Sequence, residues 1–110
     1  MTGISKSNII KKKLSGRADF TEKIMELREL KYFLAVAQAG NISGAAEALY
    51  ITQPSLSRQM QNLEREVGGA LFERGKRRIT LTERGKLLKK RAEEMLELYE
   101  KTVSEVSAPA

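Results

Sequence analysis

Polar side chains that can bind nucleic-acid bases recur along one face of the segment from residue 52 to residue 65. With the apolar positions set aside, that face consists of short, mostly uncharged side chains: Gln53, Pro54, Ser55, Ser57, Arg58, Gln61, Asn62 and Arg65. Gln and Asn can pair bidentately with adenine, Arg with guanine, and Ser with several base edges. No acidic residue, which DNA phosphates would repel, occurs from Thr52 to Leu63. The pattern favours contact with DNA bases over the alternatives of a solvated or a protein-binding face.

Basic side chains surround a short turn that follows this segment. Arg74, Lys76, Arg77 and Arg78 stand next to Gly75. A hairpin tip with this charge can lie along phosphates or place an arginine in the minor groove. Charge that protects a strand edge against unwanted pairing is the alternative. We expect contacts to the DNA backbone or minor groove here, and also from five polar residues of the helical region: Ser43, Thr52, Ser55, Gln61 and Asn62.

Two helices joined by a tight turn are needed to present the polar face. A preceding helix that ends at Gly40 is predicted from apolar residues spaced three and four apart: Leu27, Leu30, Phe33, Leu34 and Ala37. Ser43 is the predicted N-cap of a short second helix that ends near Tyr50. Thr52 is the predicted N-cap of a third helix, which ends at Gly68. A short helix, a turn and a longer helix have the spacing of a helix-turn-helix motif.

A small hairpin and a long last helix are predicted downstream. Ile79 and Leu81 alternate with polar residues in the second strand of the hairpin, and Thr82 can cap the helix that follows. Along that helix, a heptad pattern comprises Leu88, Ala92, Met95, Tyr99, Thr102 and Val106. We expect this stripe to pair two chains, which would place two recognition helices in successive major grooves. Packing of the stripe on its own domain is the alternative.

The absence of two residue types narrows the chemistry. The sequence contains no cysteine and no histidine, so thiol, Ser-His and Cys/His-ligated zinc sites cannot be built. We therefore expect no enzyme activity, no cofactor and no metal. No stretch approaches the roughly 18 apolar residues of a membrane span, and we expect a soluble chain without a membrane partner.

The positive charge is concentrated in particular segments. Residues 71–92 carry nine basic and two acidic residues, whereas residues 93–110 carry one basic and five acidic residues. A focused excess of this kind suits nucleic-acid phosphates, and the acidic end of the last helix argues against a membrane surface. Residues 1–24, with six basic and two acidic residues, are predicted to form a flexible basic extension. This extension is either a DNA-contacting arm or a stretch without function.

These patterns together predict a mainly helical, winged helix-turn-helix fold. Residues 25–82 are the expected DNA-binding domain, with the helix-turn-helix at about 42–68 and the β-hairpin wing at about 70–82. The recognition helix is expected at residues 52–68. A long C-terminal linker and dimerisation helix follows at 83–106, and residues 107–110 form a tail.

The run from Met25 to Gly85 resembles the N-terminal DNA-binding domain of the LysR-type transcriptional regulators. The match is carried by LRELKYF at 27–33, Ala45-Ala46 with Leu49, TQPSLSRQ at 52–59, Leu63-Glu64, and LFER at 71–74 leading into LTE at 81–83. The resemblance implies a cytoplasmic bacterial transcription regulator that binds a pseudo-palindromic site on double-stranded DNA. Its implied partners are a second copy or a related regulator, through the linker helix, and RNA polymerase. It also implies base contacts from Gln53, Pro54, Ser57 and Arg58, and a wing contact from Arg77.

Three features depart from the usual pattern of that family. Gly44 stands where the family often has a basic or polar residue that reaches a phosphate, and Arg84 replaces a small residue before Gly85. Family members also continue with a two-lobed effector-binding domain, so we expect no small-molecule effector site in these 110 residues. A fragment, or a free-standing competitor of full-length regulators, would fit this length. A protein-interaction module that pairs through its last helix is the rival from another functional class.

Overall fold

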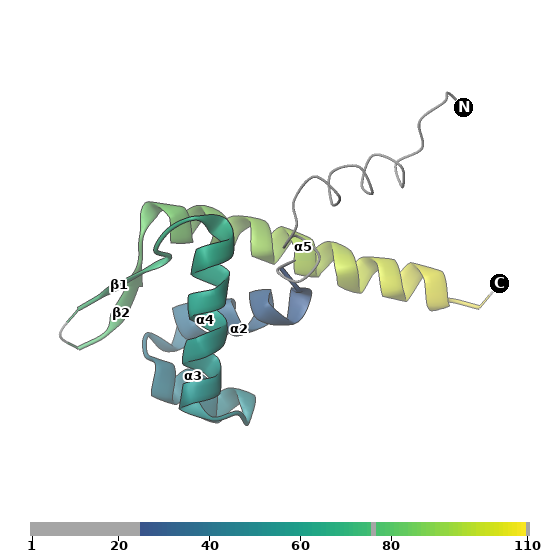
Figure 1. Cartoon of the computed structure of the whole chain (residues 1–110). Coiled ribbons are helices and arrows are strands. Elements are labelled where there is room, and N and C mark those ends of the chain that lie inside the picture. Colours follow the sequence, from purple (N-terminus) through teal and green to yellow (C-terminus); the bar gives the residue numbers. More distant parts are fainter. Residues whose placement is uncertain (1–24, 76, 110) are drawn as a thin grey trace, which may run out of the picture.

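The computed structural model describes residues 25–75 and 77–109, which form a helical body, a two-stranded hairpin and one long helix (Figure 1). The elements in chain order are α2 (Leu27–Ala39), α3 (Ile42–Leu49), α4 (Gln53–Val67), β1 (Phe72–Arg74), β2 (Ile79–Leu81) and α5 (Glu83–Ser107). This architecture confirms the predicted fold class. Lys76 and the extension predicted for residues 1–24 lie outside the described residues.

The core is formed where α2, α3, α4 and the start of α5 meet. Its fully buried large side chains are Leu30, Phe33, Val36, Leu56, Leu63 and Leu71. Ala45 and Ala46 of α3 are buried with them, and their small size lets α3 approach its neighbours closely. The centroids of the Phe33 and Phe72 rings lie 5.4 Å apart. This contact joins the wing to the helical body. This core fixes which face of α4 is turned outward.

The helix ends follow the capping residues closely. Thr52 Oγ1 accepts a hydrogen bond from the Ser55 amide (3.2 Å), and Thr82 Oγ1 accepts one from the Gly85 amide (3.0 Å), so both predicted N-caps are confirmed. The prediction that Ser43 caps α3 is wrong. The helix begins at Ile42, and the residue before it, Asn41, has extended backbone and accepts from the Gly44 amide. An N-cap must directly precede the first helical residue, which excludes Ser43.

The wing is attached to the body by hydrogen bonds at its base. The strands pair antiparallel with Phe72 opposite Leu81 and Arg74 opposite Ile79. The Ile79 amide donates to the Gly40 carbonyl (2.7 Å), which ties β2 to the end of α2. Thr82 Oγ1 donates to the Ala70 carbonyl (2.8 Å). The hairpin therefore has a defined position beside the helices (Figure 1).

The long helix α5 has two parts with different surroundings. Leu88 and Ala92 are buried in the core of the same chain, and Met95 packs against it. At Leu88 and Ala92 the structure therefore agrees with the alternative, in which the stripe packs on its own domain, because the small domain still has core space beneath the first half of α5. Met95 is half-buried, and pairing through the rest of the stripe stays a prediction. From Leu98 onward the large apolar side chains are exposed, at 52% for Tyr99, 48% for Val103 and 79% for Val106. No helix within residues 25–75 and 77–109 is long and apolar enough to cross a membrane.

Candidate nucleic-acid interface

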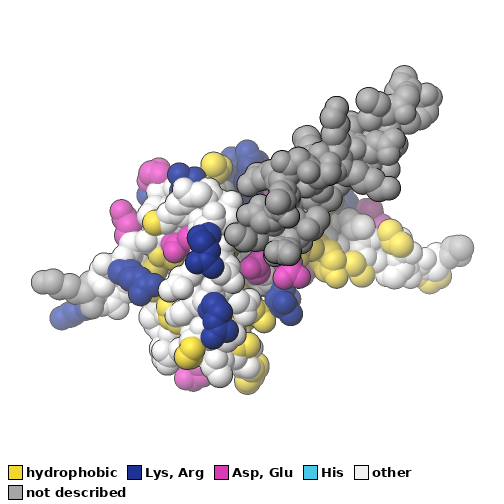
Figure 2. All heavy atoms as spheres, in the orientation of Figure 1, with side chains coloured by type: hydrophobic (Ala, Val, Ile, Leu, Met, Phe, Trp, Pro, Cys, Tyr) yellow, Lys and Arg dark blue, Asp and Glu magenta, His cyan; other side chains and the backbone are white. Residues whose placement is uncertain are grey.

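The outward face of α4 carries the polar side chains that were predicted to contact DNA bases. Leu56, Met60 and Leu63 are buried, and this leaves the polar positions turned away from the core. Those that are exposed are Gln53, Pro54, Arg58, Gln61, Asn62 and Arg65, while Ser55 and Ser57 are half-buried. Figure 2 shows basic side chains over α4 and along the hairpin on the same side of the molecule. Gln61 and Asn62 lie roughly 12 Å further along α4 than Gln53, at 1.5 Å per residue.

Several polar groups at the start of α4 have partners within the chain. Thr52 Oγ1 holds the Ser55 amide, and Gln59 Nε2 donates to Ser55 Oγ (3.4 Å). Gln53 Nε2 donates to Ser43 Oγ of α3 (3.1 Å). The structure therefore brings Ser43 beside a predicted base-contacting residue, although the two are ten positions apart. Sequence patterns gave no signal for this contact, since it depends on the packing of α3 against α4.

The three described arginines of the wing lie in different environments. Arg74 and Arg77 are exposed on the hairpin. The Arg78 guanidinium lies against Gly40, where a Cβ atom would be 2.9 Å from Arg78 Nη2. Arg78 therefore covers the end of α2 near the base of the wing. All three of these arginines are exposed, and their contacts with DNA stay a prediction.

The basic residues at the start of α5 are largely engaged with the protein itself. Arg84 Nη1 donates to the Val67 carbonyl at the end of α4 (2.9 Å), where a cation also complements the helix dipole. Lys86 pairs with Glu83 (3.0 Å) and Arg91 with Glu94 (2.8 Å). The hydrogen bond and charge of Glu83 raise the pKa of Lys86. No sequence pattern indicated this role of Arg84, although the last carbonyls of any helix lack donors within the helix.

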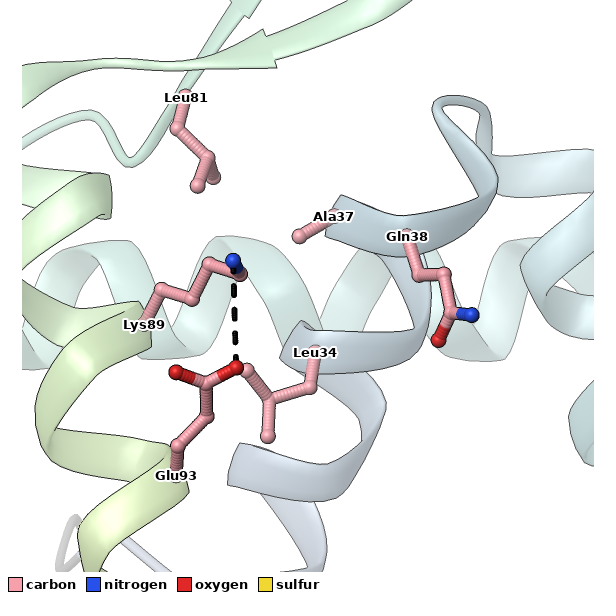
Figure 3. Close-up of a pocket in the computed structure, with 6 residues that line it drawn as sticks. All are labelled: Leu34, Ala37, Gln38, Leu81, Lys89 and Glu93. Carbon is pink, nitrogen blue, oxygen red and sulfur yellow. Dashed lines mark ion pairs between the residues drawn. The ribbon is translucent and has the colours of Figure 1, made fainter.

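A pocket of about 440 Å³ lies between α2, β2 and α5, away from the start of α4 (Figure 3). It is lined by Leu34, Ala37, Gln38, Leu81, Lys89 and Glu93. Lys89 Nζ and Glu93 Oε2, 3.9 Å apart, form the ion pair drawn across it. The partial engagement of Lys89 makes it a weaker candidate for phosphate contact than the exposed arginines of the wing.

Comparison with known proteins places this geometry in a family. The sequence profile described as "Bacterial regulatory helix-turn-helix protein, lysR family" matches residues 27–86. The chain belongs to the LysR family. The matched region runs from the first residue of α2 into α5, and it includes the helix-turn-helix and the wing.

Curated LysR-family regulators are similar over most of this chain. The regulator TfdT of Cupriavidus pinatubonensis is 45% identical over 86 residues, which is 78% of this chain and 38% of TfdT. The regulator BsdA of Bacillus subtilis is 46% identical over 83 residues, which is 74% of this chain and 29% of BsdA. The chain therefore spans less than two fifths of the length of these relatives.

Solved LysR-family structures share the fold. The DNA-binding domain of CbnR, in a complex with DNA, has 45% identity and a TM-score of 0.71, covering 74% of this chain and 94% of that one. The DNA-binding domain of BenM, in a complex with catB site 1 DNA, has 44% identity and a TM-score of 0.71, covering 74% and 92%. Each of these neighbours therefore has this architecture while bound to DNA.

Proposed function

We propose that this chain is a sequence-specific, DNA-binding transcription regulator that binds a pseudo-palindromic site as a dimer, with α4 in the major groove. The observation that carries the proposal is the exposed, acid-free face of the first two turns of α4. DNA would repel carboxylates at this position, and amide, hydroxyl and guanidinium groups match base edges. The DNA complexes of CbnR and BenM, which share this fold, support the same conclusion.

The proposal assigns two kinds of contact to the chain. Gln53, Pro54, Ser57 and Arg58 contact base edges and select the sequence. The positively charged wing contributes sequence-independent affinity, with Arg74 on the phosphates and Arg77 on the phosphates or in the minor groove. The DNA backbone is contacted from the ends and sides of α4 by four further residues, Thr52, Ser55, Gln61 and Asn62.

Selection from a pool of random duplexes, repeated at increasing salt, tests this assignment. Gln53→Ala and Arg58→Ala should each reduce discrimination at particular bases, at a cost of about 1 to 3 kcal/mol. Arg74→Ala should instead weaken binding to all sequences alike. It should also reduce the slope of log affinity against log salt concentration by about one. Lys101→Ala, which removes a positive charge from the exposed far part of α5, is the control and should leave selection unchanged. Unaltered selection in both α4 variants would refute the assignment.

A protein-interaction module is the second candidate function. It is favoured by one observation, the exposed apolar side chains on the second half of α5. Under this alternative, α5 pairs with a partner, such as a related regulator, and DNA contact is incidental. Failure of the parent chain to select any sequence at any salt, with self-association intact, would favour the interaction module.

A further inference from the structure

The side chain of Gln53 is held in place by a residue of the neighbouring helix. Gln53 is the first residue of α4 and Ser43 is the second residue of α3. Gln53 Nε2 donates a hydrogen bond to Ser43 Oγ at 3.1 Å. Both side chains are exposed, so the Gln53 amide is oriented at the surface that would meet DNA.

The position of Ser43 is itself determined by the structure around it. Asn41 Oδ1 accepts from the Gly44 amide, and Asn41 Nδ2 donates to the Ala39 carbonyl (3.3 Å). A Cβ atom on Gly44 would lie 3.1 Å from Asn41 Oδ1, so glycine leaves the cap uncrowded. Ala45 and Ala46, the next two residues, are buried in the core. The start of α3 therefore presents Ser43 Oγ to Gln53 from a rigid base.

The hydrogen-bonding capacity of the amide shows what this contact leaves free. A glutamine side chain has two N–H donors and one carbonyl acceptor. Ser43 occupies one donor and leaves the other donor and Oε1 available. Bidentate pairing with adenine uses one donor, to N7, and one acceptor, from the N6 amino group. The amide bound by Ser43 thus retains the pair of groups that adenine requires.

We propose that Ser43 is a positioning residue that orients the Gln53 amide for recognition of adenine, an inference that rests on the DNA-binding function proposed above. Ser43 removes rotamers of Gln53 before DNA arrives, and pre-organisation of this kind lowers the entropic cost of binding. It also fixes which edge of the amide faces outward. The role is distinct from a direct contact between Ser43 and a phosphate, because it acts only through Gln53.

A double-mutant cycle separates these two roles. Affinity is measured for the duplex that the parent chain selects, and for duplexes in which the base pair contacted by Gln53 is replaced. Ser43→Ala should reduce the preference for adenine roughly two- to tenfold, which corresponds to one hydrogen bond. In a Gln53→Ala background, Ser43→Ala should have no further effect, since coupled residues are not additive. Equal loss in both backgrounds, or an unchanged adenine preference, would overturn the proposal.

Two further variants and one spectroscopic measurement complete the test. Ser43→Thr keeps the hydroxyl group and should restore the preference, whereas Ser104→Ala, an exposed serine of α5, should behave like the parent. In the free protein, the NMR signals of the Gln53 side-chain amide should shift in Ser43→Ala and not in Ser104→Ala. Unshifted signals would contradict the positioning role. A parent chain that selects no sequence would refute the DNA-binding function itself, whereas normal selection with no Ser43 effect would refute only the positioning role.

Discussion

Glu66, near the end of α4, is the described carboxylate whose surroundings are least favourable to its charge. Its Oε1 atom is buried without a hydrogen-bond partner among the described residues. Desolvation by burial, followed by repulsion from Glu29 and Glu26, raises the pKa of Glu66 above its ordinary value of 4.5. The charged carboxylate therefore opposes folding, because an unpaired buried group loses hydration without compensation.

We predict that Glu66→Gln stabilises the protein at neutral pH. Because the pKa of Glu66 is raised in the folded state, protonation of its carboxyl increases the free energy of unfolding. This contribution to stability is complete below pH 4.5 and is lost as the pH rises through the folded-state pKa. The stability difference between Glu66→Gln and the parent should therefore be largest at neutral pH and shrink on acidification. Urea unfolding across this range measures the difference, with exposed Glu97→Gln as the control. A variant less stable than the parent at pH 7 would contradict the argument.

At the scale of the elements, close contacts between neighbouring segments help to determine this fold. Gly85 in the first turn of α5 lies directly against the segment that leads into the wing. A Cβ atom on Gly85 would stand 2.1 Å from the Leu71 carbonyl oxygen, which itself accepts from the Thr82 amide (3.0 Å). This close approach requires the absence of a side chain, and it holds the base of the wing against α5.

We predict that Gly85→Ala destabilises the protein by about 1 to 3 kcal/mol, since the added methyl group forces the backbone apart. The greater helix propensity of alanine recovers only a part of this cost. Thermal unfolding measures the effect, and Lys90→Ala, at an exposed position of the same helix, should stay within about 0.5 kcal/mol of the parent. Equal stability of Gly85→Ala and the parent would show that the junction can separate without cost.

At the scale of the whole molecule, α5 links the body that we propose binds DNA to the surface that we propose pairs with a second copy. The helix has 25 residues and is therefore about 37 Å long. Its first half completes the core, and its second half extends beyond the body (Figure 1). Apolar side chains on this second half are exposed. The exposed members of the predicted pairing stripe are Tyr99, Thr102 and Val106, and Val103 adds a further exposed apolar side chain beside them.

We predict that Val103→Glu prevents the proposed pairing and leaves the chain monomeric, because pairing would bury a carboxylate without a partner. Binding to a duplex with two half-sites should weaken, whereas binding to a single half-site should remain as in the parent. Sedimentation measures the mass, and Lys101→Glu, on another face of α5, is the control. A Val103→Glu dimer as stable as that of the parent would remove this part of α5 from the interface.

Local sequence signals predicted most of the fold. Gly40 and Gly68 have positive φ at the ends of α2 and α4, where glycine is favoured. Thr52 and Thr82 act as N-caps because the hydroxyl of the residue before a helix can accept a hydrogen bond from a free amide of the first turn. Tyr50 also has a positive φ. The predicted helix end near Tyr50 is confirmed, although a left-handed conformation is uncommon for a tyrosine.

The residue types along α4 were sufficient to identify a polar, acid-free face, because helical periodicity separates the apolar positions from the polar ones. The motifs spread over residues 27–83 were sufficient to indicate the family. Tertiary packing alone decided the rest. It placed Ser43 against Gln53, Arg84 at the end of α4, Arg78 over Gly40, and Leu88 and Ala92 in the core. These contacts join positions far apart in the chain, and such distances are set by how the helices pack and not by any local pattern.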